Sequence, residues 1–249
     1  MSFGEILAIA AAGFAAGMIN TVVGSGTLIT FPVLLAFGYA PVTANVSNTV
    51  GLVPGSVSGA IGYRRELAGQ RAQAIRLGTA SALGAITGAV LLLVLPASAF
   101  KAIVPVFIAL ALVLIVLQPR LNRLLTARAA HSAHTGRVLL VALYATGVYG
   151  GYFGAAQGIL LLGILGLALT QDLHRTNALK NVLAGLVNGV SGIYFILVAH
   201  IEWGPAAIIA ASSILGAQIG ARYGRRLNPV ALRGVIVVIG VSAIVHLVA

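Results

Sequence analysis

The glycine-rich segment near the N-terminus offers the clearest chemistry in this chain. Gly24-Ser25-Gly26 interrupts a long apolar stretch, and a shorter apolar stretch begins at Thr27. A helix that starts at Thr27 would present unpaired N–H groups and the positive end of its dipole to the interruption. The two glycines would let a ligand approach the backbone, and the two hydroxyl groups would add donors. This pattern favours anion binding, although the glycines could also serve only a tight turn or close packing.

A second apolar region has a comparable interruption at Gln157-Gly158, which we interpret as the counterpart of the first. Asn20 adjoins the first interruption and is a further candidate for lining a site. Lys180 lies near the start of a later apolar stretch, where it could face an anion. Snorkelling of its ammonium to the membrane interface is the simpler explanation for Lys180.

An Asn-rich segment follows each interrupted region. The amides are Asn45 and Asn48 in the first half, and Asn177 and Asn181 in the second. A spacing of three or four residues places the members of each pair on one face of a helix. Amide donors suit an anion that must be bound and then released. The alternative is that these amides bridge neighbouring helices, as is common in membranes.

The elements that would position these residues are membrane helices. Hydrophobic residues make up 59% of the 249 residues, charged residues only 8%, and the mean hydropathy is +1.05. A water-soluble domain could not cover its surface with this composition, so we predict an all-α, polytopic membrane protein. Apolar runs long enough to span a bilayer lie at 41–63, 71–95, 98–118, 174–199, 204–222 and 229–248.

Two regions, 5–38 and 138–170, are too long for one spanning helix and too short for two, so we predict that each forms a broken helical hairpin. The positions of the basic residues suggest how the chain is threaded. Three connections, within 64–76, 120–137 and 222–233, carry 12 of the 15 basic residues. Basic connections favour the cytoplasmic side, which places both termini outside.

An internal repeat relates the two halves of the chain. Val57-Ser58-Gly59 matches Val190-Ser191-Gly192 at an offset of 133, and Asn48 falls on Asn181 in the same register. Each half is then one hairpin plus three spans, which makes the halves an inverted repeat. We predict a single transport domain over 1–249, with repeat one at about 5–118, a cytoplasmic linker at 119–137 and repeat two at 138–248. Such repeats place the substrate near the midplane; we expect the two broken hairpins to meet there and the halves to rock around the site.

Other classes of function have weaker support in the residues. The chain has no cysteine, and its four acids all fall near the ends of spans, so we expect no enzyme activity and no cofactor. A cation or metal permease would be favoured if His131, His134, His174 and Asp172 converged. A non-transporting membrane scaffold is the remaining alternative, and it would need an obligatory partner.

The chain resembles the TauE/SafE sulfite-exporter family of membrane transporters over nearly its whole length. The resemblance rests on GFAAGMINTVVGSGTLITFPVLLAFGYAP and TANVSNTVGLVPGSVSGAIGY, and on their repetition as GVYGGYFGAAQGILLLGILGL and TNALKNVLAGLVNGVSGIY. The glycine run often seen at the break in this family reads Gly24-Ser25-Gly26 here. The resemblance implies transport of sulfite, sulfonates or related sulfur-containing anions across a bacterial cytoplasmic membrane. The expected partners are therefore a small-molecule anion and membrane lipid, without nucleic acid; a coupling proton or ion and a homo-oligomer stay open.

Overall fold

The computed structural model describes residues 1–128, 136–224 and 229–248, with side chains for 1–120, 136–224, 234 and 236–245. Within these residues the chain forms ten helices and no strand, as the composition predicted. They are α1 (Phe3–Val22), α2 (Thr27–Ala36), α3 (Pro41–Gly62), α4 (Arg71–Val94), α5 (Ala97–Arg128), α6 (Arg137–Tyr152), α7 (Gln157–Ala168), α8 (Leu173–Val198), α9 (Trp203–Tyr223) and α10 (Pro229–Val248).

Among the described residues, five helices are long and apolar enough to cross a membrane, namely α1, α4, α5, α8 and α9. Helix α3 has 22 residues, but no stretch of it of spanning length is as apolar as those of the five. The reason is that Asn45, Ser47 and Asn48 lie on its buried face, where they contact other helices rather than lipid. Helix α5 continues through Pro119 to Arg128, ten residues beyond the predicted end of that span.

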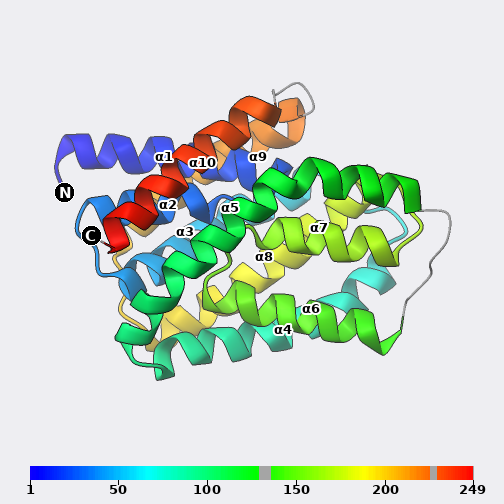
Figure 1. Cartoon of the computed structure of the whole chain (residues 1–249), viewed down its shortest axis with the longest axis horizontal. Coiled ribbons are helices and arrows are strands. Elements are labelled where there is room, and N and C mark those ends of the chain that lie inside the picture. Colours follow the sequence, from blue (N-terminus) through cyan, green and yellow to red (C-terminus); the bar gives the residue numbers. More distant parts are fainter. Residues whose placement is uncertain (129–135, 225–228, 249) are drawn as a thin grey trace.

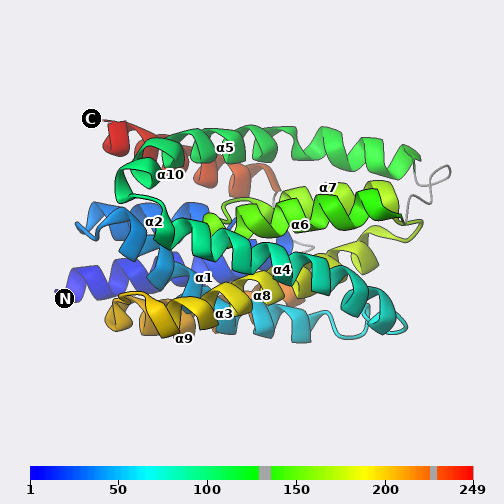
Figure 2. The ribbon, with the colours of Figure 1, turned by 90° about the horizontal axis from the view of Figure 1, so that it is seen from below.

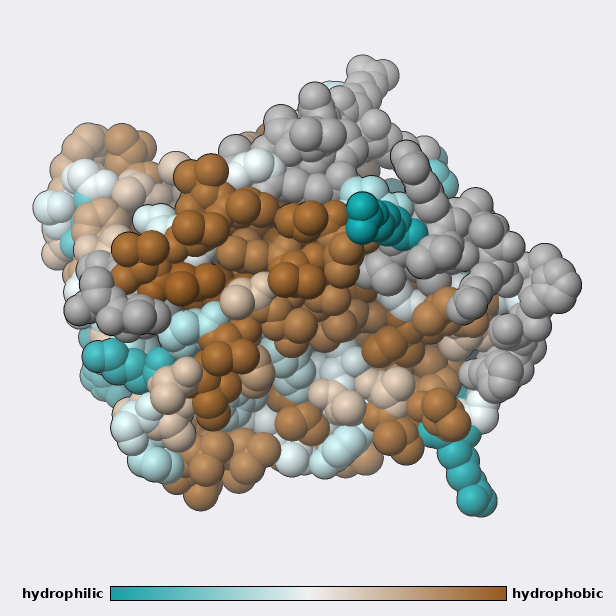
Figure 3. All heavy atoms as spheres, in the orientation of Figure 1, coloured by the Kyte–Doolittle hydropathy of each residue, from teal (hydrophilic) through white to brown (hydrophobic). Residues whose placement is uncertain are grey.

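The outer surface carries the apolar side chains that a bilayer requires. Val106, Leu110 and Val113 of α5 are exposed, as are Val238 and Val241 of α10. These two helices lie side by side along one edge of the molecule, next to α2 and α7 (Figure 2). Apolar residues cover much of the face seen in Figure 3. Exposed leucine and valine at this density would be unfavourable in water and are stable against lipid.

Both interrupted regions fold back on themselves, as predicted. The Tyr39 hydroxyl, just beyond α2, donates a hydrogen bond of 2.6 Å to Glu5 Oε1 near the start of α1. Leu139 near the start of α6 belongs to the same apolar cluster as Leu165 and Leu169 at the end of α7. The α1–α2 hairpin opens toward the end of the molecule that holds both termini, and the α6–α7 hairpin opens toward the opposite end (Figure 1).

Helix pairing crosses between the two halves of the chain. Helix α1 packs along α9, and α6 packs along α4, through glycines that leave no room for a side chain. A Cβ on Gly216 would collide with the carbonyl of Phe14, and one on Gly88 with the carbonyl of Val148. Such small-residue contacts let helix backbones approach closely in a membrane.

Two bundles result from this pairing: α1, α3 and α9 form the first, and α6, α8 and α4 form the second. Helices α3 and α8 contact each other where the bundles meet. Each contact in one bundle has its equivalent in the other, as α1–α9 corresponds to α6–α4, and such matching is what a two-fold relation requires. The inverted repeat itself stays a prediction, which this pairing supports.

Candidate functional site

The two helix interruptions touch each other. The Gly158 N–H donates a hydrogen bond of 3.1 Å to the Gly24 carbonyl, which joins the two hairpins backbone to backbone. A Cβ on either glycine would collide with the Cα of the other. Gly24 also has a φ of +89°, a left-handed conformation that favours glycine. Both positions therefore require glycine, and the contact brings together the two sites of interrupted backbone.

The first interruption holds unused donors. The Ser25 side chain is 1% exposed, and its Oγ has no hydrogen-bond partner among the described residues. The backbone N–H groups of Ser25, Gly26 and Thr27 likewise have no acceptor in the described part of the chain. Helix α2 begins at Thr27, so the positive end of its dipole adds to these donors. Donors of this kind are what an anion site would need, and the anion site itself stays a prediction.

Lys180 is buried, not extended to the interface. Its side chain is 0% exposed, and its Nζ donates to the carbonyls of Asn20 at 3.2 Å and Thr21 at 3.3 Å. The snorkelling interpretation is therefore wrong. The physical reason is that the last turn of α1 leaves carbonyl groups without helical partners, and these attract a cation. Asn20 contributes to this contact through its backbone carbonyl.

Two amides share the same acceptor as Lys180. Asn177 and Asn181 each donate from Nδ2 to the Thr21 carbonyl, at 3.4 Å and 3.3 Å. The Asn-rich segment of the second half therefore caps the first arm of the first hairpin. Asn177 Oδ1 is buried and has no partner among the described residues.

The first half makes the corresponding contact with the second hairpin. Asn45 donates from Nδ2 to the carbonyl of Tyr152, the last residue of α6, at 3.0 Å. Asn48 accepts a hydrogen bond from the Thr30 hydroxyl and donates to Thr27 Oγ1 at 3.4 Å. Asn45 thus supports the second interruption, as Asn177 and Asn181 support the first, whereas Asn48 bonds to α2 of its own half. All four amides link neighbouring helices.

The two Asn-rich segments lie on opposite sides of the α3–α8 crossing. Asn188 of α8 donates to the Ser56 hydroxyl of α3 at 3.2 Å, and Gly192 lies against Val53. The helices therefore run antiparallel, because a later residue of α8 meets an earlier residue of α3. The structure does not gather all the predicted amides around one point: Asn45 lies at the second interruption, and the other three lie at the first, namely Asn48, Asn177 and Asn181.

Gln157 is the first residue of α7 and is 3% exposed. Its Nε2 donates to the Thr146 carbonyl of α6 at 3.3 Å. Ala156 before it has a φ of +58°, the left-handed region that non-glycine residues seldom adopt. Gln157 therefore ties the two arms of the second hairpin together at a strained turn.

An aromatic cluster beside the interruptions was not predicted from the sequence. Phe153, which follows α6, stacks edge to face with Phe31 of α2 at a ring-centroid distance of 5.2 Å. Phe100 and Phe107 of α5 contact the ring of Phe153. The neighbouring Tyr152 hydroxyl is buried without a partner in the described residues. The aromatic run just before Gln157 is the feature of the sequence that could have indicated this cluster.

The predicted metal-binding residues do not form a site where the structure describes them. Asp172 is the N-cap of α8, and its Oδ1 accepts from the backbone N–H groups of His174 at 2.8 Å and Arg175 at 3.0 Å. No group of three His, Cys, Asp or Glu side chains that could hold a metal ion occurs in the described part of the chain. His131 and His134 lie outside the described residues.

Comparison with protein families matches residues 9–247 to the family described as "Sulfite exporter TauE/SafE". The chain belongs to this family. A "Probable membrane transporter protein ORF9" from Sinorhizobium sp is 29% identical and covers 96% of this chain and 90% of the relative. "Probable membrane transporter protein YfcA" from Escherichia coli K12 is 27% identical over 90% of this chain and 82% of the relative.

A "Probable membrane transporter protein" from Haemophilus influenzae is 28% identical over 91% of this chain and 88% of the relative. No solved structure matches the chain. Family membership and the apolar helices together make this protein a multi-pass membrane transporter.

Proposed function

We propose that the transported substrate is a small anion, namely sulfite, a sulfonate or a related sulfur-containing oxyanion, bound where the two interruptions meet. The observation that carries this proposal is the burial of Lys180 without a carboxylate partner among the described residues. A buried ammonium that has only neutral carbonyl partners favours an anion nearby, because desolvation of an uncompensated charge is costly.

The donors of the first interruption give the anion a place to bind. Ser25 Oγ and the N–H groups of residues 25–27 are directional donors in a buried setting, and an oxyanion has several acceptor atoms. The acids do not oppose an anion there: Glu5 bonds Tyr39, and Asp172 caps α8, both near helix ends. The family description, which names sulfite, supports the sulfur-containing class.

Transport would require the two interruptions to separate. The Gly158–Gly24 hydrogen bond closes the space between the hairpins in this structure, so a ligand passes only when that contact opens. We expect the two bundles, rather than the two sequence halves, to rock against each other, because α9 packs with α1 and α3 of the first half and α4 packs with α6 and α8 of the second. The site is then exposed to one side of the membrane at a time.

A pair of serine variants tests the site. Ser25→Ala removes a donor to the charged substrate, and we expect uptake of radiolabelled sulfite by proteoliposomes to fall by roughly 10- to 100-fold. Ser81→Ala is the matched control, because Ser81 is equally buried and equally without a partner, but lies on α4. Equal sulfite flux in Ser25→Ala, Ser81→Ala and the unaltered protein would rule out the proposed site. Organosulfonates in the same assay define the preferred substrate.

The orientation is part of the proposal. The ends of α3 and α5, which lead into basic connections, lie at the end of the molecule opposite both termini (Figure 1), which favours basic connections in the cytoplasm and termini outside a bacterial inner membrane. Since the chain has no cysteine, single cysteines can report each side. We expect a membrane-impermeant thiol reagent added to intact cells to label Ser2→Cys and to leave Arg65→Cys unlabelled. The reverse pattern would invert the orientation.

A further inference from the structure

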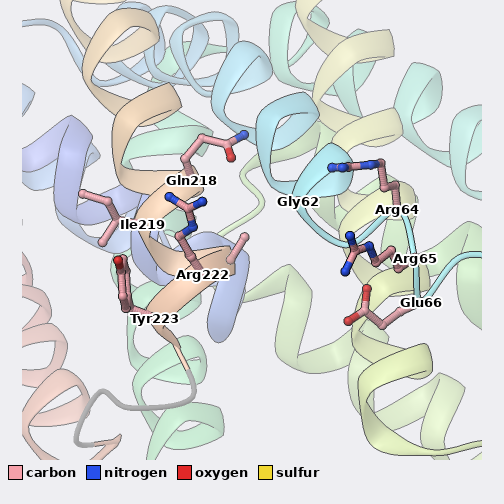
Figure 4. Close-up of a pocket in the computed structure, with 9 residues that line it drawn as sticks. Gly62, Arg64, Arg65, Glu66, Gln218, Ile219, Arg222 and Tyr223 are labelled. Atoms are coloured by element: carbon pink, nitrogen blue, oxygen red, sulfur yellow. The ribbon is translucent and has the colours of Figure 1, made fainter.

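The ends of α3 and α9 form a polar pocket on the basic side of the molecule. The pocket has a volume of about 460 Å³ and is separate from the helix interruptions. Its polar lining residues are Arg64, Arg65, Glu66, Gln218, Arg222 and Tyr223. Figure 4 shows Arg64 and Arg65 extending from the end of α3 toward Arg222 and Gln218 of α9.

Helix packing fixes the walls of this pocket. Gln218 Nε2 donates to the Ser58 carbonyl at 3.1 Å and to the Ser58 hydroxyl at 2.7 Å, which joins α9 to α3. One turn further along, Gly62 lies so close to Ala221 that a Cβ on Gly62 would collide with the alanine methyl. The pocket is therefore a preformed feature of the α3–α9 contact.

The charge of the pocket is positive, because three arginines face one glutamate. Arg64 donates to the Ile61 carbonyl at 3.3 Å, so part of its role is to cap α3. Arg65 and Arg222 have no hydrogen-bond acceptor among the described residues, and both are exposed. Guanidinium groups on the two walls of one pocket suit the tetrahedral oxygens of a phosphate.

The pocket also has an apolar outer wall. On α9, Ile219 is 39% exposed and Tyr223 is 46% exposed, next to Arg222. An aromatic and an aliphatic side chain beside arginines at the end of a membrane helix are typical of the lipid headgroup region. A soluble phosphate would gain nothing from this wall, whereas a phospholipid would contact it with its glycerol and upper acyl carbons.

We propose that the pocket between the ends of α3 and α9 binds the headgroup of an anionic phospholipid. Arg65 and Arg222 would hold the phosphate, Gln218 would stay fixed to α3, and Tyr223 would flank the glycerol. Glu66 lowers the net charge, which favours a singly charged headgroup over a polyphosphate. This site is distinct from the transport site and does not depend on its substrate.

The test is native mass spectrometry of the purified protein with added phosphatidylglycerol or phosphatidylcholine. Arg65→Gln/Arg222→Gln removes two charges from the pocket. Arg120→Gln/Arg137→Gln removes two exposed charges from other helices, so it is the matched control. Each arginine near an anionic lipid contributes roughly fivefold in affinity, so the pocket variant should bind phosphatidylglycerol on the order of 30-fold more weakly. The control should change by less than about threefold.

Three results would overturn the proposal. Equal losses in the two double variants would show general attraction to the basic end rather than a site. Equal binding of phosphatidylcholine and phosphatidylglycerol by the unaltered protein would remove the charge argument. Displacement of phosphatidylglycerol by millimolar inorganic phosphate or glycerol 3-phosphate would identify a soluble anion as the ligand. Circular dichroism of each variant verifies that the helices are intact before affinities are compared.

Discussion

Lys180 differs from Lys101 in its surroundings, although both lie on membrane helices. Lys101 is exposed on α5, whereas Lys180 is enclosed by carbonyls of α1 and amides of α8. Removal of the charge at Lys180 takes away the attraction for an anion but leaves Asn177 and Asn181 to cap Thr21. A substitution at Lys180 can therefore test anion transport while the hydrogen bonds that cap α1 remain.

We predict that Lys180→Gln lowers sulfite flux in proteoliposomes by roughly 10- to 100-fold, the cost of losing a charged donor. Lys101→Gln is the matched control, and its sulfite flux should equal that of the unaltered protein. The melting temperatures of both variants in detergent should stay close to that of the unaltered protein. Undiminished flux in Lys180→Gln would show that the buried ammonium has no part in anion transport.

Tyr39 offers a test of the first hairpin by pH. Burial of Tyr39, with the hydrogen bond to Glu5 as a lesser cause, raises the pKa of its phenol from 10.0 to about 12. The folded state thus keeps a proton that the unfolded state loses above pH 10. The protonated phenol therefore contributes to the free energy of unfolding fully below pH 10, and this stabilisation is lost as the pH rises toward 12. We predict that Tyr39→Phe is destabilised by about 1 kcal/mol at pH 7.

The measurement for Tyr39 is thermal unfolding in detergent at pH 8, 9, 10 and 11. The unaltered protein should lose stability more steeply than Tyr39→Phe above pH 10, so the two curves should converge. Parallel curves across this range would show that Tyr39 ionisation is not linked to folding.

Sequence reasoning identified most of these residue positions but not their partners. Gly24 and Gly158 could be predicted because glycine between two apolar runs implies an interruption in each helix. That the two hairpins meet was expected from the repeat, but the backbone hydrogen bond between Gly24 and Gly158 was not, because nothing in either segment encodes which atoms face each other. The burial of Lys180 was missed for the same reason: its acceptors, Asn20 and Thr21, lie about 160 positions earlier in the chain.

At the scale of elements, the α4–α6 seam depends on glycine. A Cβ on Gly88 would collide with the Val148 carbonyl, which belongs to the backbone and cannot move aside alone. Gly189 on α8 is the matched control, because a Cβ there would have no neighbouring atom within 4 Å. The same substitution should thus have opposite effects at two helical glycines.

We predict that Gly88→Ala destabilises the protein by about 1–3 kcal/mol through overpacking. Gly189→Ala should be neutral or stabilise by up to about 1 kcal/mol, because alanine favours helix. Denaturant unfolding followed by circular dichroism measures both. A loss of stability at Gly189 as large as that at Gly88 would contradict the packing argument.

Helix boundaries were predictable to within a few residues for most spans, because the bilayer fixes the length of an apolar run. The end of α5 was an exception, since residues 119–128 are polar enough to suggest a connection yet continue the helix. The pairing of α1 with α9 and α6 with α4 was beyond sequence reasoning. Glycines at four-residue spacing show that a helix has a close partner, without showing which helix that is.

At the scale of the whole molecule, the two bundles predict which contacts must change during transport. A Cβ at Gly185 of α8 would lie 3.5 Å from the Ser56 Cβ of α3, a separation suited to a disulfide between the bundles. A Cβ at Gly224 would lie 3.7 Å from the Val22 Cβ, which gives a matched link between α9 and α1 within one bundle. The chain has no native cysteine to interfere.

We predict that oxidised Gly185→Cys/Ser56→Cys loses sulfite flux and that reduction with dithiothreitol restores it. Oxidised Gly224→Cys/Val22→Cys should transport as well as its reduced form. Non-reducing gels verify that each disulfide has formed. If the inter-bundle link is complete and flux persists, the bundles do not rock against each other at the α3–α8 crossing.

The packing of α1 against α9 of the other half has a consequence for biosynthesis. The ribosome completes α1 about 200 residues before it completes α9, a delay of roughly 10–40 s at 5–20 residues per second. During this time the glycine face of α1 has no partner in the nascent chain. The amino-terminal half alone should therefore be a poor folding unit, and chains released early are expected to be substrates for membrane quality-control proteases.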